Sequence, residues 1–93
     1  MLRVRFFLNE PNGESCKHFK KMMPKLAEKY DIEIEVTSKS KPEYLTYKYF
    51  ALDLPVAPAV MVGNEIITEG KDIEDYKVEA AICRHLGLPE PKL

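Results

Sequence analysis

The feature that most constrains the fold is an apolar extended run that leads through a turn into one long helix. Residues 3–8 are rich in β-branched and aromatic side chains, a composition typical of a buried strand. Residues 9–13 contain turn-forming residues, among them Asn12 and Gly13. Residues 14–30 then carry apolar side chains at spacings of three and four, which predicts a helix with one buried face.

A cysteine stands in the first turn of this predicted helix. The first backbone N–H groups of a helix have no intrahelical partner, and the helix dipole is positive there. A thiolate at Cys16 is therefore stabilised, and we expect a reactive thiol. Lys17 and His18 follow directly and can add positive potential, and Ser15 can cap the helix. The alternatives are an inert buried Cys16 and a solvated surface His18.

The same helix is predicted to bury a stripe of side chains and to bend once. Pro24 should kink the helix without ending it. The predicted stripe consists of Phe19, Met22, Met23, Leu26 and Tyr30.

The middle of the chain predicts a second strand and a second helix. Residues 32–36 alternate strictly between apolar and acidic, which predicts an edge strand whose glutamates discourage further pairing. Residues 38–41 read as a polar loop, with Ser40 or Lys41 at the cap position. Residues 43–52 then read as a helix with Pro42 in its first turn.

The last part of the chain predicts a hairpin and a final helix. Residues 59–62 and 65–68 flank the two-residue hairpin signal Gly63-Asn64. Asp72 is the expected cap of the last helix, Gly87 its end, and residues 89–93 a loose tail. The expected buried stripe of that helix is Ile73, Tyr76, Ala80, Ile82, Cys83 and Leu86.

The predicted element order is β-α-β-α-β-β-α in a single domain of 93 residues. The first two strands, joined by a helix, should run parallel with a right-handed crossover. The fold class predicted is α/β, with a four-stranded mixed sheet flanked by helices.

This order and two local motifs resemble the thioredoxin-like family, in its minimal thioredoxin or glutaredoxin form. Thioredoxins carry Cys-x-x-Cys at the helix start and a proline eight residues after the first cysteine. Pro24 lies eight residues after Cys16, so the resemblance implies that Cys16 is the nucleophilic cysteine. Phe19 occupies the position of the second cysteine, which makes this a Cys-x-x-Phe site.

The second motif lies before the third predicted strand. The segment Ala57-Pro58-Ala59 resembles the place where thioredoxin-like proteins carry a cis-proline facing the active-site cysteine. The resemblance implies a cis bond at Pro58, and not at Pro55. It also implies that Ala57, Pro58 and Ala59 line a groove for the extended backbone of a substrate.

The leading function implied by the resemblance is single-cysteine thiol–disulfide exchange. Cys16 would form a mixed disulfide with a protein or small-molecule disulfide, and an external thiol would release it. No resident cofactor is expected, and glutathione is a candidate co-substrate. One alternative is a thioredoxin-fold binding module without catalysis. The other is a glutaredoxin-like iron–sulfur carrier, with Gly70-Lys71-Asp72 resembling a glutathione-binding segment.

Composition argues against several other classes of function. The net charge is −1 with 31% charged residues, so no strong field attracts nucleic acid or a membrane surface. The two cysteines and two histidines form no metal-binding motif. Cys83 is expected in the core, and His85 near a helix C-terminus. We expect a cytoplasmic protein, since two distant cysteines do not suggest a disulfide-stapled secreted protein. We also expect a monomer.

Overall fold

The computed structural model describes residues 1–10 and 14–91. Residues 11–13 and the capping side chain of Ser15 lie outside the described residues. The elements in chain order are β1 (Leu2–Glu10), α1 (Glu14–Lys29), β2 (Ile32–Ser40), α2 (Lys41–Tyr44), α3 (Tyr47–Phe50), β3 (Ala59–Val62), β4 (Glu65–Glu69) and α4 (Asp75–Leu86). The turn predicted over residues 9–13 is wrong for its first two residues, because Asn9 and Glu10 continue β1 in register with β2.

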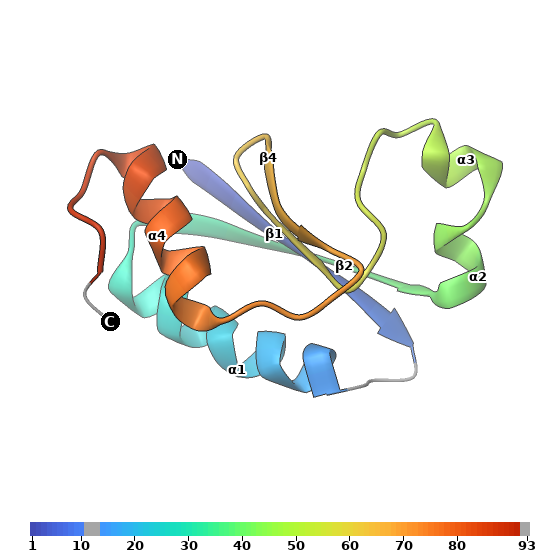
Figure 1. The fold of residues 1–93 in the computed structure, drawn as a ribbon, viewed down its shortest axis with the longest axis horizontal. Helices are drawn as coiled ribbons and strands as arrows, with labels where there is room; N and C mark the ends of the chain where they lie inside the picture. Colours follow the sequence, from blue (N-terminus) through green and yellow to red (C-terminus); the bar gives the residue numbers. More distant parts are fainter. Residues whose placement is uncertain (11–13, 92–93) are drawn as a thin grey trace.

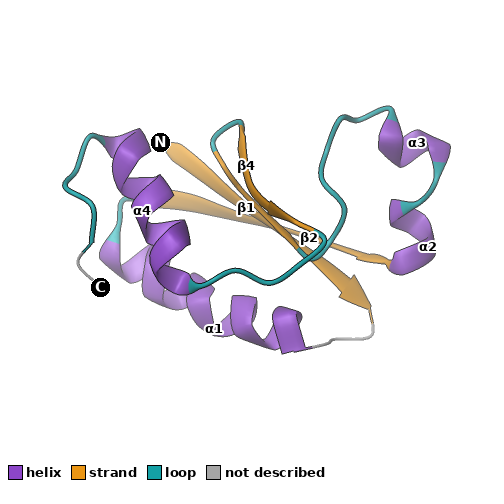
Figure 2. Cartoon of the chain, viewed as in Figure 1, coloured by secondary structure: helices purple, strands orange, loops and turns teal. Residues whose placement is uncertain are grey.

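The four strands form one mixed sheet in the order β2-β1-β3-β4 (Figures 1 and 2). β1 pairs with β2 in parallel and with β3 antiparallel, and β3 pairs with β4 antiparallel. The predicted α/β class and the mixed four-stranded sheet are therefore confirmed. The molecule is a small α/β domain consistent with a thioredoxin-like fold.

The two faces of the sheet bury different sets of side chains. α1 and α4 lie together on one side of the sheet, whereas α2 and α3 stand at the end where β2 finishes (Figure 1). On the α1 and α4 side, Phe6 of β1 meets Phe19 of α1 edge to face, with ring centroids 5.5 Å apart. On the other face, Phe7, Tyr44 and Tyr49 form a second, aromatic cluster. Alternation along β1 thus directs neighbouring phenylalanines into separate cores.

Several local predictions are confirmed. α1 continues through Pro24. β3 and β4 form a hairpin across Gly63, which adopts a positive φ of 59°. Gly87 ends α4 in the left-handed conformation.

The segment after β2 differs from the prediction in two ways. Residues 38–40 belong to β2 and not to a polar loop, because the parallel register with β1 continues to the pair Glu10–Ser40. The single helix predicted over residues 43–52 is wrong as well. The chain forms two short helices instead, because Thr46 caps the start of a second one. The Thr46 backbone is extended, and its hydroxyl accepts a hydrogen bond from the Tyr49 N–H at 3.3 Å.

The start of α4 also differs. α4 begins at Asp75 with Glu74 at the cap position, so the capping role predicted for Asp72 is wrong. Tyr76 is exposed and does not belong to the buried stripe. Val78, Ala81 and Ile82 are buried instead, because they pack into the core cluster between the helices and the sheet, and Cys83 is buried beside them in α4.

Across the described residues, none of the helices combines the length and apolar character needed to cross a membrane.

Candidate functional site

The candidate site lies where β1 ends and α1 begins. Cys16 is the third residue of α1, within the first turn, as the sequence predicts. Its side chain is only 2% exposed and belongs to the core cluster on the α1 side of the sheet. The Cys16 thiol donates to the backbone oxygen of Asn9 across 3.4 Å. The last part of β1 thus supplies the acceptor for the thiol.

Asn9 also connects this thiol to the loop before β3. Its side-chain amide donates to the backbone oxygen of Ala57 at 3.3 Å. The Ala57–Pro58 peptide bond is cis, and Pro55 is not in a cis bond, as expected. Cys16 and the predicted groove residues Ala57, Pro58 and Ala59 are therefore joined through one residue. Asn9 was predicted only as part of a turn, and its role depends on tertiary contacts that no local motif encodes.

A second set of contacts holds the same loop against β4. The backbone N–H of Val56 donates to the carboxylate of Glu69 at 3.2 Å, and the N–H of Gly70 donates to the Val56 oxygen at 3.1 Å. Ala57 and Ala59 are buried, whereas Pro58 is half-buried. The proline is therefore the member of this trio that offers surface to a ligand.

Phe19 stands at the position of a second thioredoxin cysteine. It is fully buried and contacts Phe6, so it is a core residue facing the sheet. No second thiol is therefore available within this turn of α1. Lys17, the residue after the cysteine, is exposed to solvent.

The imidazole of His18 lies between two carboxylates. Its Nδ1 atom lies 2.8 Å from Asp72, in the segment before α4, and its Nε2 atom is bonded to Asp75 in the first turn of α4. The hydrogen bond to Asp72 raises the pKa of His18 above its usual 6.5, with Asp75 adding to the effect and burial opposing it. Both ring nitrogens thus serve this contact between α1 and α4. We call the three residues the His18 clamp.

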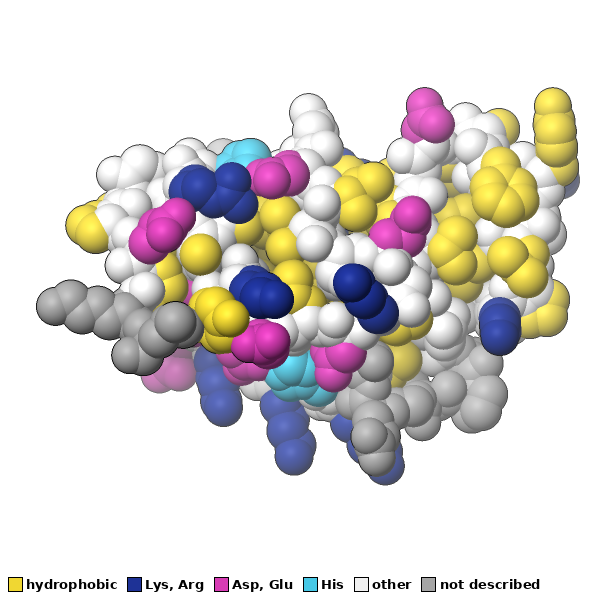
Figure 3. Space-filling view, viewed as in Figure 1, with side chains coloured by type: hydrophobic (Ala, Val, Ile, Leu, Met, Phe, Trp, Pro, Cys, Tyr) yellow, Lys and Arg dark blue, Asp and Glu magenta, His cyan; other side chains and the backbone are white. Residues whose placement is uncertain are grey.

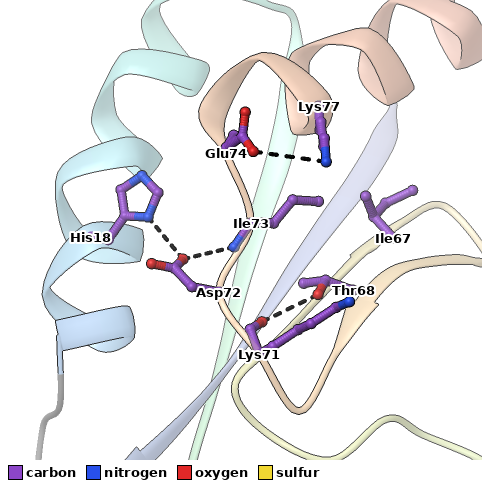
Figure 4. A pocket seen from close by; sticks show the side chains of 8 residues that line it. All are labelled: His18, Ile67, Thr68, Lys71, Asp72, Ile73, Glu74 and Lys77. Carbon is purple, nitrogen blue, oxygen red and sulfur yellow. Dashed lines mark hydrogen bonds and ion pairs between the residues drawn. The ribbon is translucent and has the colours of Figure 1, made fainter.

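A pocket of about 400 Å³ opens beside the clamp, between β4 and the start of α4 (Figure 4). The pocket is lined by acidic and basic side chains together with two isoleucines. The lining residues are His18, Ile67, Thr68, Lys71, Asp72, Ile73, Glu74 and Lys77. Thr68 is buried and donates its hydroxyl proton to the backbone oxygen of Lys71 at 3.2 Å, which fixes the turn that follows β4.

The second cysteine is distant in role from the first. Cys83 is 3% exposed in α4 and lies 3.6 Å from the hydroxyl of Tyr30. That hydroxyl donates to Glu79 at 2.8 Å, and Lys29 pairs with the same carboxylate at 2.7 Å. Cys83 is therefore a core residue at the base of a polar contact between α1 and α4.

Within residues 1–10 and 14–91, no group of three or more histidine, cysteine or acidic side chains is arranged to hold a metal ion. Protein-family models give no match to the sequence, and neither curated proteins nor solved structures give a significant one. The function is therefore inferred from the chemistry of the site itself.

Proposed function

We propose that the protein carries out single-cysteine thiol–disulfide exchange through Cys16. The observation that carries this proposal is the link from Cys16 through Asn9 to the cis-Ala57–Pro58 bond. The thiol lies in the first turn of a helix, and the cis-proline loop to which Asn9 ties it offers a surface for an extended chain.

The proposed reaction has two steps. The Cys16 thiolate attacks one sulfur of a disulfide, and a new bond forms while the old S–S bond breaks. The other sulfur leaves as a thiolate and takes a proton from water. An external thiolate then attacks the mixed disulfide and releases Cys16. With glutathione as that thiol, a glutathionylated peptide and glutathione yield the free peptide thiol and oxidised glutathione.

The need for an external thiol follows from the residue at position 19. Phe19 has no thiol and is fully buried in the core, so an incoming reductant must supply the second sulfur. The pocket beside the His18 clamp offers Lys71, Lys77 and Glu74 to a zwitterionic peptide thiol such as glutathione.

The burial of Cys16 sets the expected rate. With 2% of its surface exposed, the thiol reacts only when the first turn of α1 moves locally. We therefore expect slow exchange, with a rate that increases under mildly destabilising conditions well below global unfolding.

The test is turnover of a glutathionylated peptide at increasing glutathione, with matched variants of the two cysteines. We expect Cys16→Ser to abolish turnover and Cys83→Ser, which changes the other buried thiol, to retain it. We expect Lys71→Ala to raise the glutathione concentration needed for half-maximal rate. Turnover that does not depend on glutathione, or that survives in Cys16→Ser, would refute the proposal.

A non-catalytic binding module is the second candidate, and one observation favours it. Figure 3 shows hydrophobic side chains gathered over α2 and α3. Leu45, Tyr47, Phe50 and Leu52 are between 56% and 88% exposed. A binding module predicts that Cys16→Ser leaves partner binding intact and that the wild-type protein forms no mixed disulfide.

A further inference from the structure

β2 is a long edge strand with one open side. It spans nine residues, and within the described part of the chain it pairs only with β1. An edge strand presents backbone N–H and C=O groups that can pair with another chain. Val36, at the middle of β2, is 51% exposed, although it is a β-branched residue suited to a paired strand.

Two charged side chains lie at equal distances from Val36 on the other face of β2. Glu33 precedes it by three residues and Lys39 follows it by three, so both share a face. Neither has an ion-pair partner among residues 1–10 and 14–91. Glu35, on the same face, is different because Arg3 of β1 holds it at 3.3 Å.

We propose that β2 is the interface for a second copy of this chain, with the two β2 strands antiparallel and Val36 on the two-fold axis, in place of the monomer and the unpaired edge strand expected from the sequence. In this register Glu33 of each copy stands directly opposite Lys39 of the other, because residues equally far from the axis face each other. Opposite charges at directly facing positions stabilise a strand pair. The two four-stranded sheets then form one continuous sheet.

The neighbouring registers are less favourable. An axis at Ile34 sets Glu33 against Glu35, and an axis at Glu35 sets that residue against itself. An axis at Thr37 sets Glu33 against Lys41, which has already left the strand for α2. Only an axis at Val36 sets both Glu33 and Lys39 opposite a residue of opposite charge within the strand.

The test is the molar mass in solution, measured by light scattering during size-exclusion chromatography and by analytical ultracentrifugation over a range of concentrations. We expect a reversible dimer of twice the 10.7 kDa chain mass. Glu33→Lys and Lys39→Glu should each weaken the dimer, because each variant brings like charges together twice. The double variant Glu33→Lys/Lys39→Glu should restore it.

Mixing the two single variants gives a sharper outcome. One chain then carries only lysines at positions 33 and 39 and the other only glutamates, so a mixed dimer should form where neither variant dimerises alone. Val36→Lys should abolish the dimer by placing like charges at the axis. Ile66→Lys, an exposed position on the opposite edge strand β4, is the matched control and should leave the dimer intact.

Circular dichroism must show that each variant remains folded. A wild-type chain that stays at 10.7 kDa up to roughly millimolar concentration overturns the proposal, since any remaining affinity would be weaker than about −4 kcal/mol. A dimer that ignores the charge variants, or that dissociates when Phe50 on α3 is changed to Ser, places the interface elsewhere and overturns it equally.

Discussion

The thiol of Cys16 and the backbone oxygen of Ala57 are both hydrogen-bonded to one residue, Asn9. The backbone oxygen of Asn9 accepts a hydrogen bond from the Cys16 thiol. The side-chain amide of Asn9 donates to the backbone oxygen of Ala57, next to the cis bond of Pro58. The candidate nucleophile and the candidate substrate groove are thus coupled through Asn9, near the end of β1.

Replacing Asn9 with Ala should separate those two hydrogen bonds. The variant keeps the backbone oxygen for Cys16 and removes only the bond to Ala57, so we expect a loss of about 1 kcal/mol in the free energy of unfolding. Asn9→Asp should cost more, because a carboxylate would face the Ala57 oxygen at close range. Urea denaturation measures both. An Asn9→Ala variant with an unchanged free energy of unfolding would show that the bond from Asn9 to Ala57 does not hold the loop before β3.

Replacing Phe19 with Cys should convert the site to a two-cysteine one. Residues three apart on a helix are neighbours at a separation compatible with a disulfide. We expect Phe19→Cys to reduce a protein disulfide without added glutathione. The free energy of unfolding should fall by less than the loss of about 3–5 kcal/mol that follows truncation of a buried phenylalanine to alanine.

Phe19→Ser is the control for this variant, because it loses similar packing without gaining a thiol. Equal glutathione-independent activity in the Cys and Ser variants would mean that looser packing, and not a resolving thiol, causes the change.

The His18 clamp should make stability depend on pH. The folded-state pKa of His18 is raised, so its stabilising contribution is fully present below the unfolded value of 6.5 and is lost as the pH rises through the folded value. The free energy of unfolding should therefore fall over that interval. His18→Gln should remove this step from the profile, and NMR titration of the imidazole should show the raised pKa. A step unchanged in His18→Gln would assign it to another group.

Tyr44 should contribute to stability through its hydroxyl. It is fully buried and donates to the backbone oxygens of Leu8 at 2.7 Å and Thr37 at 3.2 Å, and burial raises its pKa to about 12. Tyr44→Phe should cost about 1–3 kcal/mol, because buried acceptors lose their donor. Since the folded pKa exceeds the usual 10.0, wild-type stability should fall as the pH rises from about 10 toward 12. A urea titration at several pH values tests both, and a neutral Tyr44→Phe contradicts the role.

The sequence predicts much of this fold because its signals are local. The strand over residues 32–36, the Gly63 turn and the Gly87 helix end depend on neighbouring residues alone, and all three appear in the structure, although Val36 on the apolar face of that strand is exposed. The cis bond at Pro58 was reached only through resemblance. The helix break at Thr46 was missed because the aromatic residues around it mask the cap signal.

The site was less predictable because its contacts cross the chain. Cys16 was identified from its helix position, whereas the link from Asn9 to Ala57 spans 48 residues. Asp72 was predicted as a cap, yet it binds His18 across 54 residues of sequence, and Asp75 was not singled out. Sequence periodicity places side chains on faces of an element, but it does not show which elements meet.

The most direct test of the account is to expose the protein to oxidised glutathione and locate the adduct by intact mass and peptide mapping. We predict one glutathione per chain, on Cys16, and complete release by reduced glutathione. Cys83→Ser should behave in the same way, and Cys16→Ser should take up none. A protein that forms no adduct, or forms it only on Cys83, would contradict thiol exchange at Cys16 and leave the binding module as the better account.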